Sequence, residues 1–211
     1  MSQFIDLYKN ACKSQPIDLV YQTNVFIELL KTTNTKKLYE IGPSYGYFSL
    51  LAGSHNWSVT AFEPDPHNYS VMCHNICTHH LESKIAPIYT HIGLNPSLDH
   101  FIGDQQIGIV KINAEGETIE IVTGLKRSLQ KRLIGHLIIN VYPRLRPTNF
   151  WIELIVHLEQ QGFRVFHLRD TGQNIKLIPF KMDELHKIPE TTLLFTEQSL
   201  VKSDEQKNPL M

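Results

Sequence analysis

Two glycines that follow a short, mostly apolar run constrain this chain more than any other feature. The run Leu38–Ile41 leads into Gly42-Pro43-Ser44-Tyr45-Gly46, after which apolar residues recur at helical spacing. Glycine tolerates positive φ and lets the backbone approach a ligand closely. A helix that begins at such a loop offers unpaired N–H groups and the positive end of its dipole. The stretch therefore predicts a strand, a tight loop and a helix start that together bind a nucleotide-like cofactor.

Length and charge narrow the class of protein. The 211 residues suit one α/β domain, and a net charge of −1 gives no global electrostatic case for binding nucleic acid or an anionic membrane. Three cysteines, Cys12, Cys73 and Cys77, are too few for a disulfide framework, and residues 1–10 lack a signal-peptide pattern. No stretch approaches the roughly 20 apolar residues that span a bilayer. We therefore expect a cytoplasmic protein without a membrane partner.

Strand-like and helix-like stretches alternate along the chain and are joined by short connections. Strands are expected at 37–41, 57–62, 85–91, 106–113, 136–142, 163–168 and 192–196, and helices at 16–33, 46–54, 66–81, 97–102, 117–129 and 149–161. Such alternation predicts a doubly wound, mostly parallel sheet with helices on both faces. We expect a single Rossmann-like domain over residues 1–198, with a packing helix at 16–33 and a flexible polar tail at 199–211.

Two acids at strand ends indicate which cofactor the loop binds. Glu40 lies at the end of the first strand, and Glu63 ends the second strand, 21 residues after Gly42. A carboxylate at the second position can accept hydrogen bonds from both ribose hydroxyls of an adenosine. A nicotinamide dinucleotide usually requires G-x-G-x-x-G against its pyrophosphate, and Gly42-x-x-x-Gly46 lacks that spacing. S-adenosylmethionine has no phosphate but carries an ammonium group that Glu40 can attract, so we predict this cofactor.

Four separate elements give the chain a resemblance to a known family. It resembles the FkbM-type S-adenosylmethionine-dependent methyltransferases over residues 37–166 in the stretch 40–49, in Ala61-Phe62-Glu63-Pro64-Asp65-Pro66, in Asn75 and in the stretch 110–117. The resemblance implies a seven-stranded methyltransferase fold, with Gly42, Ser44 and Gly46 beneath the methionine and ribose of the cofactor. It also implies Glu63 on the ribose hydroxyls, Asn113 near the transferred methyl group, and O-methylation of a hydroxyl group on a small molecule or glycan.

Two amides stand where acids are usual in that family. Asn113 replaces the aspartate of the family's Lys-Ile-Asp-x-Glu-Gly element, and Asn140 lies at the end of the next strand, where an acid is common. An amide can orient a hydroxyl group but cannot act as a general base. The candidate proton acceptors are Glu115, ranked first by position, His136 and His91. The substitutions leave open a catalytically impaired binding or scaffold protein.

A cluster of cysteines and histidines lies in the helix expected after the second strand, comprising Cys73, His74, Cys77, His79 and His80. Cys73 and Cys77 share one side of the helix, but a zinc site normally gathers ligands from two elements. We therefore predict no metal, and expect the cysteines to be buried on the side that faces the sheet.

A local run of basic residues comprises Lys126, Arg127, Lys131, Arg132, Arg144 and Arg146. Cations near a helix C-terminus are favoured by the helix dipole, which is sufficient to explain most of the run. A phosphate-bearing substrate or RNA is the alternative, and it leaves RNA methylation open as a second activity class.

Overall fold

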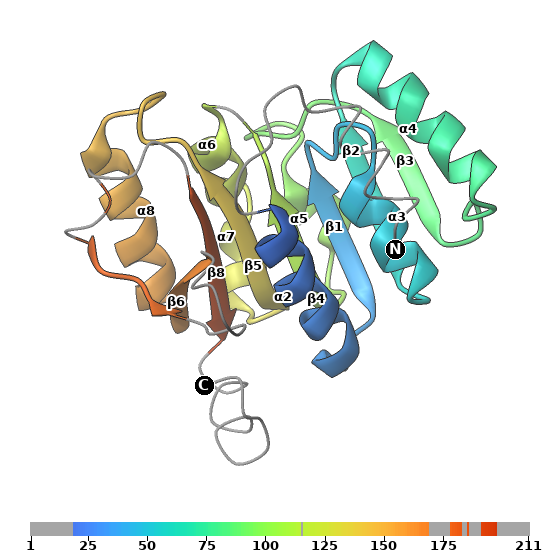
Figure 1. Ribbon diagram of the computed structural model, residues 1–211. Coiled ribbons are helices and arrows are strands. Elements are labelled where there is room, and N and C mark those ends of the chain that lie inside the picture. The colour runs from blue at the N-terminus through green and yellow to red at the C-terminus, as the bar shows by residue number, and fades with distance from the viewer. Residues whose placement is uncertain (1–18, 115, 169–177, 183–184, 186–190, 198–211) are drawn as a thin grey trace.

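A central sheet runs through the part of the chain that the structure, a computed structural model, describes: residues 19–114, 116–168, 178–182, 185 and 191–197 (Figure 1). Its strands are β1 (Lys37–Ile41), β2 (Ser58–Glu63), β3 (Ile85–Tyr89), β4 (Ile107–Ile112), β5 (Ile134–Val141), β6 (Phe163–Leu168), β7 (Ile178–Pro179) and β8 (Thr191–Glu197). The order across the sheet is β3-β2-β1-β4-β5-β8-β6-β7. Strands β1 to β5 pair in parallel, and β8 enters antiparallel between β5 and β6.

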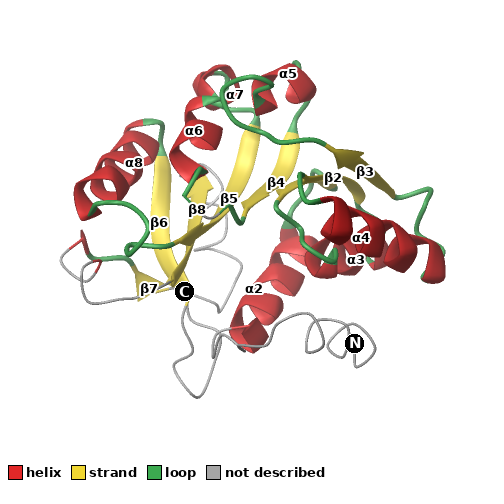
Figure 2. Cartoon of the chain, turned by 90° about the horizontal axis from the view of Figure 1, so that it is seen from above, coloured by secondary structure: helices red, strands yellow, loops and turns green. Residues whose placement is uncertain are grey.

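Helices cover both faces of this sheet, as Figure 2 shows. They are α2 (Leu19–Thr32), α3 (Tyr47–Ser54), α4 (Pro66–Thr78), α5 (Leu98–Ile102), α6 (Thr118–Thr123), α7 (Lys126–Gln130) and α8 (Thr148–Gln160). Residues of α2, α3 and α4 pack in one apolar core, and residues of α5 to α8 pack in the other. The predicted arrangement, a mostly parallel sheet between two helical layers, is confirmed.

Strand β4 lies at the centre of the sheet, and all six of its residues are buried. A parallel strand that is covered on both faces must be apolar nearly throughout, which explains the continuous run in its sequence. Gly108 allows the strand to pass close to the segment before β1, because a Cβ at this position would lie 2.0 Å from the Thr35 carbonyl oxygen. Lys111 is the one charged residue of the strand.

The single helix expected at 117–129 is instead two short helices, α6 and α7, that meet at Gly124. A Cβ on Gly124 would lie 2.6 Å from the carbonyl oxygen of Gly93, in the segment after β3. The break therefore allows that segment to pack against the turn. Strand β7 was not predicted, because its two residues are too few to show a hydrophobic period.

Further expectations concern the cysteines, metal binding, membrane spans and the two ends of the chain. The cysteines are not buried as predicted, since Cys77 is exposed and Cys73 is half-buried. Within the described ranges, no cluster of three or more His, Cys, Asp or Glu could hold a metal ion, and no helix is long and apolar enough to cross a membrane. The expected starting residues 16–18 of the packing helix and the tail at 199–211 lie outside the described residues.

Candidate functional site

The carboxyl ends of β1, β2 and β4 meet at one edge of the sheet. The Gly42 N–H donates to the Phe62 carbonyl at 3.0 Å, and the Asn113 N–H donates to the Ile41 carbonyl at 2.9 Å. These bonds continue the ladders past the strand ends, so the three following loops begin side by side. Ligands of open α/β sheets bind outside the carboxyl ends of the strands, and this edge is the candidate site.

The loop between β1 and α3 has left-handed backbone at three alternate residues, with φ of 69° at Gly42, 54° at Ser44 and 87° at Gly46. A Cβ on Gly42 would lie 2.1 Å from the Asn113 carbonyl oxygen, so only glycine fits there. Gly46 is the N-cap of α3. Buried Asn75 of α4 donates from Nδ2 to the Tyr45 carbonyl at 2.9 Å and holds the loop from its other side.

Glu63 ends β2 with its carboxylate against this loop. Its Oε2 accepts the Ser44 N–H at 2.9 Å, and its Oε1 accepts the Asp65 N–H at 3.0 Å. Burial raises the pKa of the Glu63 carboxyl, and the two backbone N–H groups partly oppose that shift. Capping of α4 is the task of Asp65, whose side chain accepts the Asn68 N–H at 2.8 Å. Helix capping therefore does not explain why a carboxylate lies at position 63.

Glu40 has partners inside the protein. It is 1 % exposed, accepts the Ser49 hydroxyl at 2.6 Å and pairs with Lys111 Nζ at 3.6 Å. Lys111 Nζ also lies 4.3 Å from the centre of the Phe48 ring. Burial lowers the pKa of the Lys111 ammonium, and the neighbouring Glu40 carboxylate opposes that shift. The pair lies beneath the glycine loop, and its link to Ser49 reaches the first turn of α3.

Asn113 is the centre of a polar network at the ends of β4 and β5. Its Oδ1 accepts Asn140 Nδ2 at 3.0 Å and the Tyr142 hydroxyl at 2.6 Å. Asn140 Oδ1 in turn accepts the Thr192 hydroxyl at 3.1 Å. A carbonyl oxygen has two acceptor sites, so Oδ1 of Asn113 is saturated and Nδ2 is the group that it can offer to a ligand. Tyr142 and Thr192 were not predicted, because their contacts depend on how β5 and β8 pair.

The predicted proton acceptors are placed very differently. His136 is buried near the amino end of β5, where Nδ1 lies 3.3 Å from the Thr196 hydroxyl and burial lowers the pKa of the imidazole to about 4. It precedes Asn140 by four residues, or about 13 Å of strand, so it cannot reach a substrate at the carboxyl edge. We correct the prediction of His136 as a base on this ground. Glu115 lies outside the described residues.

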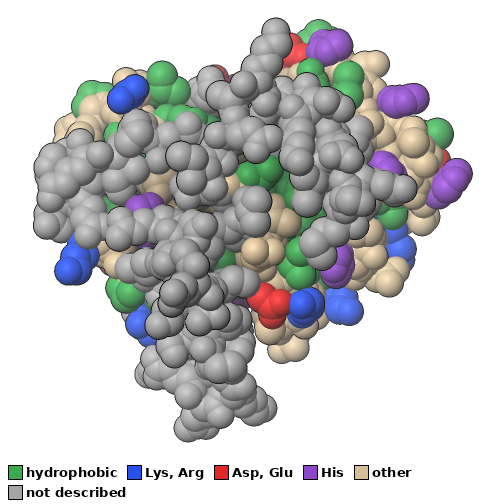
Figure 3. Space-filling view, in the orientation of Figure 1, with side chains coloured by type: hydrophobic (Ala, Val, Ile, Leu, Met, Phe, Trp, Pro, Cys, Tyr) green, Lys and Arg blue, Asp and Glu red, His purple; other side chains and the backbone are tan. Residues whose placement is uncertain are grey.

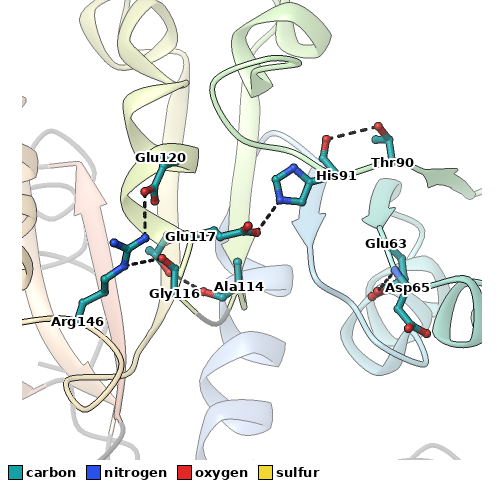
Figure 4. Close-up of polar contacts among 10 residues, drawn as sticks. Glu63, Asp65, Thr90, His91, Ala114, Gly116, Glu117, Glu120 and Arg146 are labelled. Carbon is teal, nitrogen blue, oxygen red and sulfur yellow. Dashed lines mark hydrogen bonds and ion pairs between the residues drawn. The ribbon is translucent and has the colours of Figure 1, made fainter.

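His91 lies at the candidate edge and contacts an acid that the sequence analysis did not select. Its Nε2 lies 2.6 Å from Glu117 Oε2, and Figure 4 shows the two side chains pointing toward one another. In the same view, Arg146 reaches the segment after β4, where Nε donates to the Gly116 carbonyl at 2.8 Å and Nη2 pairs with Glu120 at 3.1 Å.

The basic run does not form one surface. Its first part lies on and after α7, before the start of β5, and Lys131 and Arg132 pair there with Asp104 and Glu197. Arg144 and Arg146 follow the opposite end of β5. On the face drawn in Figure 3, Lys and Arg side chains are visible at several separate places. Of the six residues, only Arg144 and Arg146 therefore lie at the carboxyl edge, where the sequence placed them for a phosphate-bearing substrate or RNA.

No protein-family model and no curated protein sequence matches the chain. The precorrin-6y C5,15-methyltransferase of Geobacter metallireducens GS-15 is similar in structure, with a TM-score of 0.57 and 13% identity over 90% of this chain and 96% of that one. An rRNA methylase from Streptococcus thermophilus has a TM-score of 0.56 and 14% identity over 89% and 99% of the two chains. TrmK of M. capricolum, in complex with S-adenosyl-homocysteine, has a TM-score of 0.51 and 14% identity over 82% and 67%.

At these identities the likeness establishes the fold. The chain has the Rossmann-like methyltransferase fold that the sequence predicted, in which the two-residue strand β7 supplements seven longer strands. The narrower resemblance to the FkbM type is not confirmed by these comparisons.

The close approach of Gly42 to Asn113 predicts a specific stability difference. Gly42→Ala introduces both a positive-φ strain and a Cβ at 2.1 Å from backbone oxygen, whereas Gly103→Ala, at φ 58°, meets no heavy atom within 4 Å. Gly103→Ala, at a φ of 58° and a ψ of −130°, should lower the free energy of unfolding by about 1–3 kcal/mol through backbone strain alone, and Gly42→Ala by clearly more. Urea unfolding of both variants measures the difference. Equal losses would contradict the close approach.

The Glu40–Lys111 pair predicts a non-additive mutant cycle. Lys111→Met leaves a buried carboxylate unpaired and should cost about 3–5 kcal/mol of unfolding free energy. The double variant Glu40→Gln/Lys111→Met leaves no lone charge, so it should cost less than the sum of the single changes. Lys31→Met is the control, because Lys31 pairs with Glu28 at the surface and its loss should cost about 0–1 kcal/mol. Additive losses at positions 40 and 111 would refute the coupling.

Proposed function

We propose that the chain is an S-adenosylmethionine-dependent methyltransferase of the FkbM type, and that it methylates a hydroxyl group of a small molecule or glycan. The observation that carries the proposal is the Glu63 carboxylate, which ends β2 and accepts a backbone N–H of the glycine loop. Each carboxylate oxygen accepts one backbone N–H and the Asn68 side chain is a further donor to the carboxylate, so Glu63 keeps an acceptor site for a ribose hydroxyl of an adenosine. The similarity to methyltransferase structures supports the same conclusion.

The chemistry of the loop suits this cofactor better than a phosphate-bearing one. The loop Gly42-x-x-x-Gly46 lacks the G-x-G-x-x-G spacing with which dinucleotide-binding loops contact a pyrophosphate. Gly42, Ser44 and Gly46 supply a backbone that passes close beneath a ligand. The sequence suggested that Glu40 contacts the methionine ammonium. Because Glu40 is buried and paired with Lys111, we propose instead that it supports α3 through Ser49.

The acceptor end of the site lies at Asn113 in this proposal. When bound, the cofactor supplies a methyl group already activated by a sulfonium, so much of the rate can come from alignment of the nucleophile. Asn113 Nδ2 can donate a hydrogen bond to one lone pair of a substrate hydroxyl oxygen. The second lone pair of that oxygen then faces the methyl group. An amine has a single lone pair, which the methyl group must receive. The saturated Oδ1 of Asn113 thus favours oxygen over nitrogen acceptors.

The substrate hydroxyl must also lose its proton. Asn113 and Asn140 cannot take it, and Glu115 stays the first candidate on sequence position. The same two amides favour the alternative of a catalytically impaired binding or scaffold protein. A screen of hydroxylated acceptors separates the two, because methylated product would appear only for the enzyme. RNA methylation is the weaker alternative, since only Arg144 and Arg146 of the basic run lie at the carboxyl edge.

Calorimetry with S-adenosylhomocysteine tests cofactor binding directly. Glu63→Gln should weaken the affinity about tenfold or more, because an amide replaces one charged acceptor with a donor. Glu82→Gln, an exposed residue outside the site, is the matched control and should leave the affinity unchanged. No heat of binding by the native protein at about 1 mM ligand would refute the proposed function.

The raised pKa of Glu63 predicts how this affinity depends on pH. The ionised carboxylate accepts the ribose hydroxyls, so binding should weaken as the pH falls through the raised pKa of Glu63, above the ordinary range of a glutamate. Stability should change in the opposite sense, because burial favours the protonated form and the contribution of Glu63 to folding is lost as the pH rises. Titrations at several pH values measure the first effect. If the affinity of Glu63→Gln still weakened as the pH fell, Glu63 would be excluded as the cause of the pH dependence.

A further inference from the structure

Large apolar side chains are exposed on α8 and just before it. Leu145 is 51% exposed, Ile152 36% and Val156 38%. Ile152 and Val156 are four residues apart, so they lie on one side of the helix, and Glu159 follows on the same side one turn later. Helix α8 is the outermost labelled helix of its layer in both views (Figure 1, Figure 2). Neighbouring exposed apolar side chains of this kind mark interaction surfaces.

A pocket of about 240 Å³ lies at the C-terminal end of the same helix. Its lining includes the apolar side chains of Phe163 and Val165 from β6 and of Phe180, which follows β7, and Glu159 of α8 also lines it. Sites for small molecules usually measure about 300–1,000 Å³. A pocket below that range suits a single inserted side chain better than a cofactor or substrate.

The turn before α8 carries Leu145 and is held at both ends. The Leu145 N–H donates to the Tyr142 carbonyl at 3.0 Å, and the Tyr142 hydroxyl donates to Asn113 at 2.6 Å. After the turn, Arg146 Nε donates to the Gly116 carbonyl at 2.8 Å. The exposed Leu145 therefore lies on a backbone that loses little freedom when a partner binds, which favours association.

Opposite charges accompany the exposed leucine and the pocket. Arg144 precedes Leu145 and is exposed, whereas the exposed Glu159 lines the pocket at the other end of α8. Neither side chain forms an ion pair within the described part of the chain. The two ends of α8, which is about 20 Å long, are thus complementary to one another in shape and in charge, and cannot meet within one molecule.

We infer that α8 forms the interface of a symmetric dimer, in which the helices of two copies pack antiparallel and Leu145 of each copy enters the pocket of the other. Both halves of the contact are present in one chain, so the surface is complementary to itself, as a two-fold interface requires. A two-fold axis midway between Ile152 and Val156 brings Leu145 to Phe163, since these lie nine residues before and after that midpoint. The occupant that fits is therefore a second copy of this chain.

Sedimentation velocity of the native chain tests this arrangement. A reversible dimer should predominate at about 100 µM protein. Leu145→Asp would place a carboxylate in the pocket, and it should weaken dimerisation about a hundredfold or more. Leu94→Asp is the matched control, because Leu94 is 62% exposed and follows β3, far along the sheet from α8. This variant should dimerise like the native chain.

Two charge variants test the antiparallel orientation. Arg144→Glu and Glu159→Arg each put like charges at both contacts of their own dimer, so each should weaken dimerisation about tenfold. In the mixed dimer of the two variants, both contacts again join opposite charges. An equimolar mixture should therefore dimerise within about threefold of the native affinity.

The inference would be overturned by a native chain that stays monomeric at about 100 µM, or by a dimer that Leu145→Asp leaves unchanged. It would also be overturned if the mixed charge variants, both with native melting temperatures, dimerised no better than each variant alone. None of these results depends on cofactor binding, so each leaves the proposed function as it stands.

Discussion

The approach of Gly42 to the Asn113 carbonyl is the constraint on which the carboxyl edge depends. A Cβ at this position would lie 2.1 Å from that oxygen, so the loop after β1 can cross the end of β4 only as glycine. The crossing brings the Ser44 N–H to Glu63 and leaves Asn113 at the junction of the loop and the β5 network. The lack of a side chain at Gly42 thereby allows Glu63 and Asn113, which are proposed to bind the ribose and the methyl acceptor, to take these positions.

Beneath the loop, a buried ion pair supports the first turn of α3. Glu40 on β1 and Lys111 on β4 are direct partners in the register of the two strands, and both are almost fully buried. A buried pair of this kind adds little net stability over apolar residues, but either charge alone is costly. Its bond to Ser49 ties the first turn of α3 to the sheet, so the orientation of that helix depends on the pair. We therefore regard Glu40 as a residue that positions the loop from below.

Local sequence was sufficient to predict the features that depend on local rules. Apolar period and strand-ending acids predicted the β-α alternation and the place of Glu63, and the two glycines predicted a loop with positive φ. Contacts between distant segments could not be predicted in this way. Tyr142 contacts Asn113 across 29 residues, and His91 contacts Glu117 across 26, through the packing of loops whose courses follow from the whole sheet. His136 could have been excluded from the sequence, because the strand expected at 136–142 already put it at the amino end, and β5 (Ile134–Val141) keeps it far from the carboxyl edge.

Amide NMR of the ¹⁵N-labelled chain during titration with S-adenosylhomocysteine measures the central claim most directly, since the Ser44 and Asp65 N–H groups both donate to Glu63. A ligand whose ribose binds Glu63 must alter both bonds, so the account predicts large shifts at Ser44 and Asp65, together with Gly42 and Gly46. Small or absent shifts at these four amides under saturating ligand, with the main changes elsewhere in the chain, would contradict it.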